Sequence, residues 1–226
     1  ETGGLYKSED KALTWKSVGD DFHSSSNIAT ITVHPTNENI VYFSNNLGEI
    51  LKTEDGGNTW NEIDSGLPSS NMGKIGLAIS PMKPEVIYAA IELDRRSGAV
   101  FRSDNSGGVW KKMSNTVAGA TGPHYYQELY ASPHVFDRIY LMNVRVLVSD
   151  DGGDNFYQMK EINKHSDNHS LAFKKDDPEY LLIGTDGGIY ESFDDTESWK
   201  FVSNLPITQF YKLAVDDSEP FYNIYG

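Results

Sequence analysis

Apolar and polar residues alternate in short segments along this chain, and we find no convincing window with the 3.6-residue period of an amphipathic helix. The apolar residues on one face of two such segments are Ile75, Leu77 and Ile79, and Ala29, Ile31 and Val33. Alternation of this kind predicts half-buried β-strands. We therefore expect each of these two faces to be buried against a neighbouring element.

A motif recurs five times along the chain at a spacing of about 45 residues. The five copies are GGLYKSEDKALTWKSV from Gly3, GEILKTEDGGNTWNEI from Gly48, GAVFRSDNSGGVWKKM from Gly98, VRVLVSDDGGDNFYQM from Val144 and GGIYESFDDTESWKFV from Gly187. They close on Trp15, Trp60, Trp110, Phe156 and Trp199, at steps of 45, 50, 46 and 43 residues. A period of this length indicates a repeat architecture.

A second motif interleaves with the first and consists of a strand, a turn rich in Pro, Asp or Asn, and another strand. Each repeat therefore contains four short strands, which predicts an all-β propeller of four-stranded antiparallel blades. Blades must stack around an axis to bury their faces. The expected blade units are approximately 28–63, 75–113, 126–159 and 168–202, with 210–226 and 1–18 sharing a split blade.

The core of the first motif predicts a turn that fastens itself. Its best-preserved copy contains Thr53, Asp55, Gly57, Thr59 and Trp60. A hydroxyl and a carboxylate accept backbone N–H bonds in such a turn, and glycine supplies a position with positive φ. The aromatic residue then packs under the turn and between blades.

At these residues the chain resembles the Asp-box or BNR-repeat β-propellers. The resemblance implies that the boxes lie on the outer rim, away from the central funnel, and are structural. The residues that it assigns to boxes are Ser8, Asp10, Trp15, Thr53, Asp55, Gly57, Trp60, Ser103, Trp110, Ser149, Asp151, Gly153, Phe156, Ser192, Asp194 and Trp199.

A narrower resemblance links the chain to exported bacterial BNR proteins with a sortilin-like propeller, related to glycoside-hydrolase BNR proteins. It rests on the segments 66–68, 73–78, 122–126, 167–169, 184–188 and 209–211. Those relatives are longer than this chain. Two interpretations of the blade number therefore stand, a closed five-bladed ring or a fragment of a ring of seven or more blades, and we favour the fragment.

Composition excludes several classes of function. The 226 residues include 19 Lys and Arg against 33 Asp and Glu, a formal net charge of −14, which disfavours a nucleic-acid partner. No apolar run approaches the roughly 18 residues of a membrane span. Absence of Cys excludes a disulfide scaffold and a thiol nucleophile. We find no P-loop, dinucleotide fingerprint or serine-nucleophile elbow, and we expect no cofactor.

Aromatic and polar residues gather where the predicted innermost strands begin. Tyr125 and Tyr126 precede one strand, His169 begins another, and Gln209 and Tyr211 open the last. Aromatic faces beside charged groups suit a sugar-binding groove. Packing between blades explains Tyr126 and Tyr211 equally well.

Carboxyl groups in the same regions are the candidates for catalysis. Hydrolysis of a glycosidic bond needs two carboxyls roughly 5 to 10 Å apart, and Glu128, Asp167 and Asp186 are the set that we nominate. A sialidase is disfavoured, because the arginine residues do not recreate the triad of that family. If the strand around 165–169 is extended, His165, Asp167 and His169 share one face with the residue types of a metal site. We prefer an ordered loop without metal, because the short match lacks a specific context.

Three functional hypotheses follow. We favour a non-enzymatic propeller that binds a peptide, protein or glycan at the mouth of the funnel. The alternative is a xyloglucanase-like glycoside hydrolase that acts on a polysaccharide through paired carboxylates. A third hypothesis is an assembly factor within a larger complex. From the habit of the family we expect export to the periplasm, the cell surface or the medium.

Overall fold

The fold is that of a computed structural model, which describes residues 4–18, 27–69, 72–94, 97–118, 125–206, 213–216, 218–221 and 223–225. Within these ranges the regular secondary structure consists of β-strands, and every strand pair is antiparallel. The described residues contain no helix with the length and apolarity that a membrane crossing needs. The predicted all-β fold of four-stranded antiparallel blades is confirmed.

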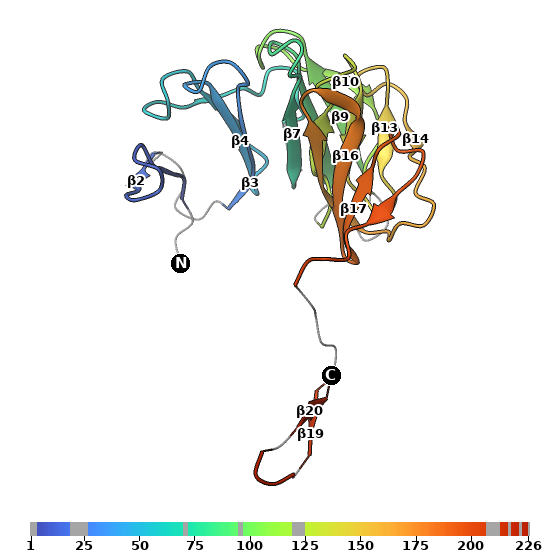
Figure 1. Ribbon diagram of the computed structural model, residues 1–226. Coiled ribbons are helices and arrows are strands. Elements are labelled where there is room, and N and C mark those ends of the chain that lie inside the picture. Colours follow the sequence, from blue (N-terminus) through green and yellow to red (C-terminus); the bar gives the residue numbers. More distant parts are fainter. Residues whose placement is uncertain are drawn as a thin grey trace.

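Four consecutive segments each form a four-stranded sheet, which we call blades 1 to 4 (Figure 1). Blade 1 contains β3 (Ile28–Val33), β4 (Val41–Asn45), β5 (Ile50–Thr53) and β6 (Asn61–Glu62). Blade 2 contains β7 (Ile75–Ile79), β8 (Ile87–Asp94), β9 (Ser97–Ser103) and β10 (Lys111–Ser114). Blade 3 contains β11 (Leu129–Ala131), β12 (Ile139–Leu141), β13 (Leu147–Ser149) and β14 (Tyr157–Gln158). Blade 4 contains β15 (Asn168–Lys174), β16 (Asp177–Thr185), β17 (Gly188–Ser192) and β18 (Lys200–Phe201).

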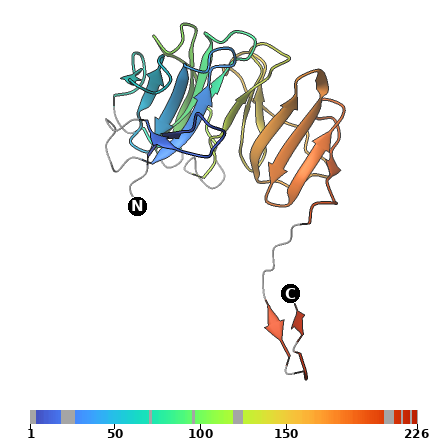
Figure 2. The ribbon, with the colours of Figure 1, turned by 60° about the vertical axis from the view of Figure 1, so that its left-hand side comes forward.

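The blades lie side by side in chain order, as Figure 2 shows. The first strand of blade 2, β7, contacts both β3 and β11, the first strands of its two neighbours. One buried apolar cluster fills each interface between consecutive blades. Stacking of this kind is how blades that cannot bury their own faces become stable.

Of the two apolar strand faces that were expected to be buried, one is buried and the other is exposed. Ile75, Leu77 and Ile79 are buried between blades. The corresponding face of β3 is exposed, and Ile31 and Val33 keep 50% and 52% of their surface accessible, so that expectation was wrong. Blade 2 covers the opposite face of β3. Among the described residues, the segments around residues 5–7 and Val18 lie beside the apolar face.

Two short hairpins flank the blades. They are β1 (Tyr6–Lys7) with β2 (Lys16–Ser17), and β19 (Ala214–Val215) with β20 (Ile224–Tyr225). Each is a separate two-stranded sheet among the described residues, and both views show β19 and β20 apart from the four blades (Figures 1 and 2). The split blade and the number of blades in the natural ring stay predictions.

The repeated turn has the hydrogen bonds that its chemistry predicts. Gly57 N donates to Thr53 Oγ1 at 2.9 Å, and Thr59 N donates to Asp55 Oδ1 at 2.9 Å. The Thr59 hydroxyl and backbone amide lower the pKa of Asp55 to about 2. Two consecutive residues have positive φ in every copy; the pairs are Lys11 and Ala12, Gly56 and Gly57, Ser106 and Gly107, Gly152 and Gly153, and Asp195 and Thr196.

The aromatic residues that follow these turns join neighbouring blades. Trp110 is buried and donates its Nε1 proton to Ile63 O of blade 1, at 2.9 Å. Trp199 is buried in the same way and donates to Lys160 O, which follows the last strand of blade 3. Trp15, in the hairpin of β1 and β2, is 59% exposed instead.

Candidate functional site

Three loops meet at one end of blades 2, 3 and 4, which we call the inner-strand mouth. Lys74, just before β7, contacts Glu128, just before β11. Tyr126, also before β11, donates a hydrogen bond to Asp167, just before β15. These contacts show that β7, β11 and β15 begin at the same end of the blades. The mouth therefore gathers side chains that are far apart in the sequence.

Three rings form the centre of this mouth. Tyr126 and His169 are stacked, with ring centroids 5.5 Å apart and planes at 15°. Tyr125 stands edge-on to both, at 5.0 Å from Tyr126 and 5.5 Å from His169. Tyr126 is 1% exposed, whereas Tyr125 is 52% exposed. Tyr126 is thus the support of the cluster, and Tyr125 is the ring that a ligand can reach.

Two of the nominated carboxylates form hydrogen bonds with the stacked rings of Tyr126 and His169. Tyr126 Oη donates to Asp167 Oδ1 at 2.9 Å, and His169 Nε2 lies 2.8 Å from Asp186 Oδ1. The two acidic residues are also joined directly, because Asp186 N donates to Asp167 O at 3.1 Å. The structure therefore brings Asp167, His169 and Asp186 together around Tyr126, although Asp167 and Asp186 belong to different loops.

Asp167 is held in its ionised form. The Ser166 hydroxyl donates to Asp167 Oδ2 at 2.6 Å and is the main cause of a lowered pKa. Partial burial acts in the opposite direction, while Tyr126 and the neighbouring residues His165 and His169 lower the pKa further. Asp167 is therefore a carboxylate at neutral pH and acts as a hydrogen-bond acceptor.

Glu128 occupies a different position from the other two acids. Its Oε1 forms an ion pair with Lys74 Nζ at 2.6 Å, and the same ammonium group lies 3.3 Å from Tyr125 O. Its Oε2 is buried without a hydrogen-bond partner. The structure thus pairs this nominated carboxylate with a cation that the sequence analysis did not single out.

His165, Asp167 and His169, the weak candidates for a metal site, do not share one face. Asp167 has a φ of 62°, so the segment before β15 is not extended and the condition for that alternative is not met. His165 Nδ1 is 3.9 Å from Asp167 Oδ2, while His169 turns to Asp186. In the part of the chain that the structure describes, no three or more His, Asp or Glu side chains are arranged to hold a metal ion. Gln209 and Tyr211, the other predicted binding residues, lie outside the described residues.

A buried polar cluster beside the mouth went unnoticed in the sequence. Glu161 and Lys164 form an ion pair at 2.7 Å with side chains 1% and 0% exposed, and Asn168 is also fully buried. In the sequence these residues look like the polar residues of any surface loop, so no local pattern reveals their burial.

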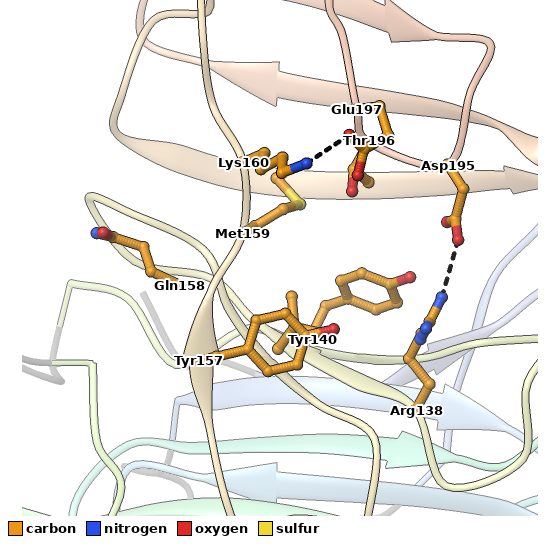
Figure 3. Close-up of a pocket in the computed structure, with 10 residues that line it drawn as sticks. Arg138, Tyr140, Tyr157, Gln158, Met159, Lys160, Asp195, Thr196 and Glu197 are labelled. Atoms are coloured by element: carbon orange, nitrogen blue, oxygen red, sulfur yellow. Dashed lines mark hydrogen bonds and ion pairs between the residues drawn. The ribbon is translucent and has the colours of Figure 1, made fainter.

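A cavity of about 260 Å³ lies between blades 3 and 4 (Figure 3), and its lining does not include Tyr125, Tyr126 or His169. Tyr140 and Tyr157 line it, and Arg138 pairs with Asp195 across its rim at 3.0 Å. Arg138 also pairs with Asp150, at 2.5 Å. Because the charged groups of this cavity pair with one another, they are less available to a ligand than the polar groups of the mouth. We therefore take the mouth as the candidate site.

Comparisons with known proteins agree on the fold. No protein-family model matches the chain. An oligoxyloglucan-reducing end-specific xyloglucanase of Emericella nidulans is 24% identical over 196 residues, which are 80% of this chain and 24% of that protein. The crystal structure of the GH74 xyloglucanase from Xanthomonas campestris matches with a TM-score of 0.64 at 17% identity, over 80% of this chain and 31% of that one.

A second kind of propeller protein also matches in structure. YCF48 from Cyanidioschyzon merolae gives a TM-score of 0.53 at 14% identity, over 77% of this chain and 55% of that one. The chain thus spans about a quarter to a half of the length of these proteins. At such identities the matches to solved structures concern the fold alone, and that fold is the β-propeller.

Proposed function

We propose that the inner-strand mouth binds an uncharged polysaccharide and that the protein is a glycoside hydrolase acting on a β-glucan of the xyloglucan type. This proposal rests on one observation: two carboxylates, Asp167 and Asp186, hydrogen-bond to the stacked rings of Tyr126 and His169, beside the exposed ring of Tyr125. The similarity to a xyloglucanase supports it.

Binding follows from the surface around Tyr125. An exposed ring offers its face to the apolar face of a sugar, and neighbouring carboxylates accept hydrogen bonds from sugar hydroxyls. The net charge of −14 and the ionised Asp167 disfavour acidic sugars. An uncharged glucan fits this combination better than a sialoside or a uronate.

Hydrolysis requires one carboxylate that stays ionised and one carboxyl that delivers a proton to the leaving oxygen. Asp167 suits the first role, because its pKa is lowered. We assign the second role to Asp186, because it follows β16 on the other side of the stack, where its Oδ1 lies 2.8 Å from His169 Nε2. A polymer of this kind lies outside cells, and we therefore also propose that the protein is exported.

A binding module without catalysis is the second candidate, for a glycan, a peptide or a protein. One observation favours it, since both oxygens of Asp167 already accept hydrogen bonds within the protein. In this case the two carboxylates would order the rings and would not react.

The test uses the full chain with xyloglucan, β-glucans and sialosides. We expect released oligosaccharides by mass spectrometry, with release lost in Asp167→Asn and Asp186→Asn. Tyr125→Ala should weaken binding about tenfold by calorimetry, which corresponds to the loss of roughly one aromatic contact. Tyr157→Ala is the matched control, because Tyr157 is 49% exposed but lies between blades 3 and 4.

Three results separate the candidates. Release that both Asp variants abolish supports the hydrolase. Binding without release, weakened by Tyr125→Ala and not by Tyr157→Ala, supports the binding module. Absence of both binding and release across the panel contradicts the carbohydrate proposal.

A further inference from the structure

A buried ion pair lies beside the candidate site without contacting its rings. Lys164 Nζ donates to Glu161 Oε1 at 2.7 Å and to Asn168 Oδ1 at 2.5 Å. Burial lowers the pKa of Lys164. Taking two charges out of water is unfavourable, and an ion pair of this kind is weak as a source of stability alone.

Lys164 contacts residues that precede and follow Asp167 in the sequence. Its ammonium group donates to His165 O, two residues before Asp167, at 2.9 Å. It also binds the side chain of Asn168, the residue directly after Asp167. Asn168 Nδ2 in turn donates to Val144 O at 3.0 Å, and Asp167 N donates to the same carbonyl at 3.0 Å. The loop is thus fixed to blade 3 around one residue.

That residue has an unfavourable backbone conformation. Asp167 has a φ of 62°, in the left-handed region that residues other than glycine adopt infrequently, although aspartate does so more often than most. Such conformations persist where the surrounding contacts determine them. In this conformation the carboxylate of Asp167 reaches the hydroxyls of Tyr126 and Ser166.

We propose that Lys164 is a positioning residue, which through His165 O and Asn168 holds Asp167 in the turn that directs its carboxylate to Tyr126. The inference rests on the proposed function only for the importance of Asp167. Its test requires no ligand, so it stands or fails separately from carbohydrate binding.

The experiment is a carbon-13 NMR titration of the Asp167 carboxyl group in the full chain. Lys164→Met removes the charge and both contacts with the loop, whereas Asn168→Ala removes the contact through Asn168 and keeps the charge and the bond to His165 O. In both variants we expect the pKa of Asp167 to rise from its lowered value toward the ordinary 3.8, because the Ser166 and Tyr126 hydroxyls are no longer in place. Lys160→Met is the control, since Lys160 forms an exposed ion pair with Glu197.

The outcomes show whether Lys164 positions Asp167, acts on it directly through its charge, or has no effect on its pKa. A rise in both variants and none in the control supports the proposal. A rise in Lys164→Met alone means that the charge acts directly on Asp167, and it overturns the proposal, as does an unchanged pKa in both folded variants. If Lys164→Met does not fold, Glu161→Gln combined with Lys164→Met removes both charges and takes its place.

Discussion

Gly76 permits a close approach between blades 2 and 3. It is the second residue of β7, and the carbonyl oxygen of Gln127 would be 1.6 Å from a Cβ atom added to it. Gln127 is fully buried and has a φ of 92°, and Tyr125 and Tyr126 immediately precede it. The glycine is thus required for contact between two backbones and not for its own dihedral angles.

Gly76→Ala tests this requirement. Ordinary contact begins near 3.4 Å, so the two backbones would have to separate by roughly 1.8 Å. Overpacking of a core costs about 1 to 3 kcal/mol, and we expect the upper end, because backbone moves less easily than a side chain. The displaced segment carries Tyr125 and Tyr126, so ligand binding at the mouth should also be lost.

Urea unfolding followed by fluorescence measures the stability change. Gly184→Ala, in β16, is the control, because the nearest atom to its added Cβ is the flexible side-chain oxygen Ser170 Oγ at 2.3 Å. We expect the control to cost less than about 1 kcal/mol. If Gly76→Ala unfolds at the same urea concentration as Gly184→Ala, the argument for close backbone packing is refuted.

Three further predictions concern the blades. Thr53→Val should cost about 1 to 3 kcal/mol in urea unfolding, since the buried Gly57 amide loses its acceptor, whereas Thr53→Ser should be nearly neutral. Because the pKa of Asp55 is lowered, its ionised carboxylate stabilises the fold above pH 4, and this contribution is lost as the pH falls toward about 2. Asp55→Asn should therefore reduce the pH dependence of the melting temperature between these two pH values. Ile91→Ala should cost about 2 to 5 kcal/mol by urea unfolding because Ile91 is fully buried, and Ile31→Ala, at an exposed position, less than about 0.5.

Sequence reasoning reached much of the fold because each blade is a local unit. Alternating strands and tight turns were visible within single repeats, and the turn around Thr53 and Asp55 has the bonds that its chemistry requires. The same reasoning failed for Ile31 and Val33, which are exposed. Alternation shows that a strand has an apolar face, but burial of that face depends on what lies beside it.

The candidate site was predicted as a set of residue types and not as an arrangement. Tyr125, Tyr126, His169 and Asp186 were named from their places near strand ends, and the structure brings them together. The partner that each side chain contacts depends on how the blades pack together. Lys74 pairs with Glu128 because the loops before β7 and β11 meet, which no spacing along the chain indicates.

The sequence by itself determined the repeat, the strands, the self-fastened turns and the residue types at the mouth. All of these depend on interactions within about one repeat, where periodicity and turn chemistry are readable. Only the tertiary structure decided that the backbone of β7 needs glycine at position 76, that Lys164 is buried and that Asp167 turns toward Tyr126. Each of these depends on which blade packs against which, and therefore on atoms that are distant along the chain.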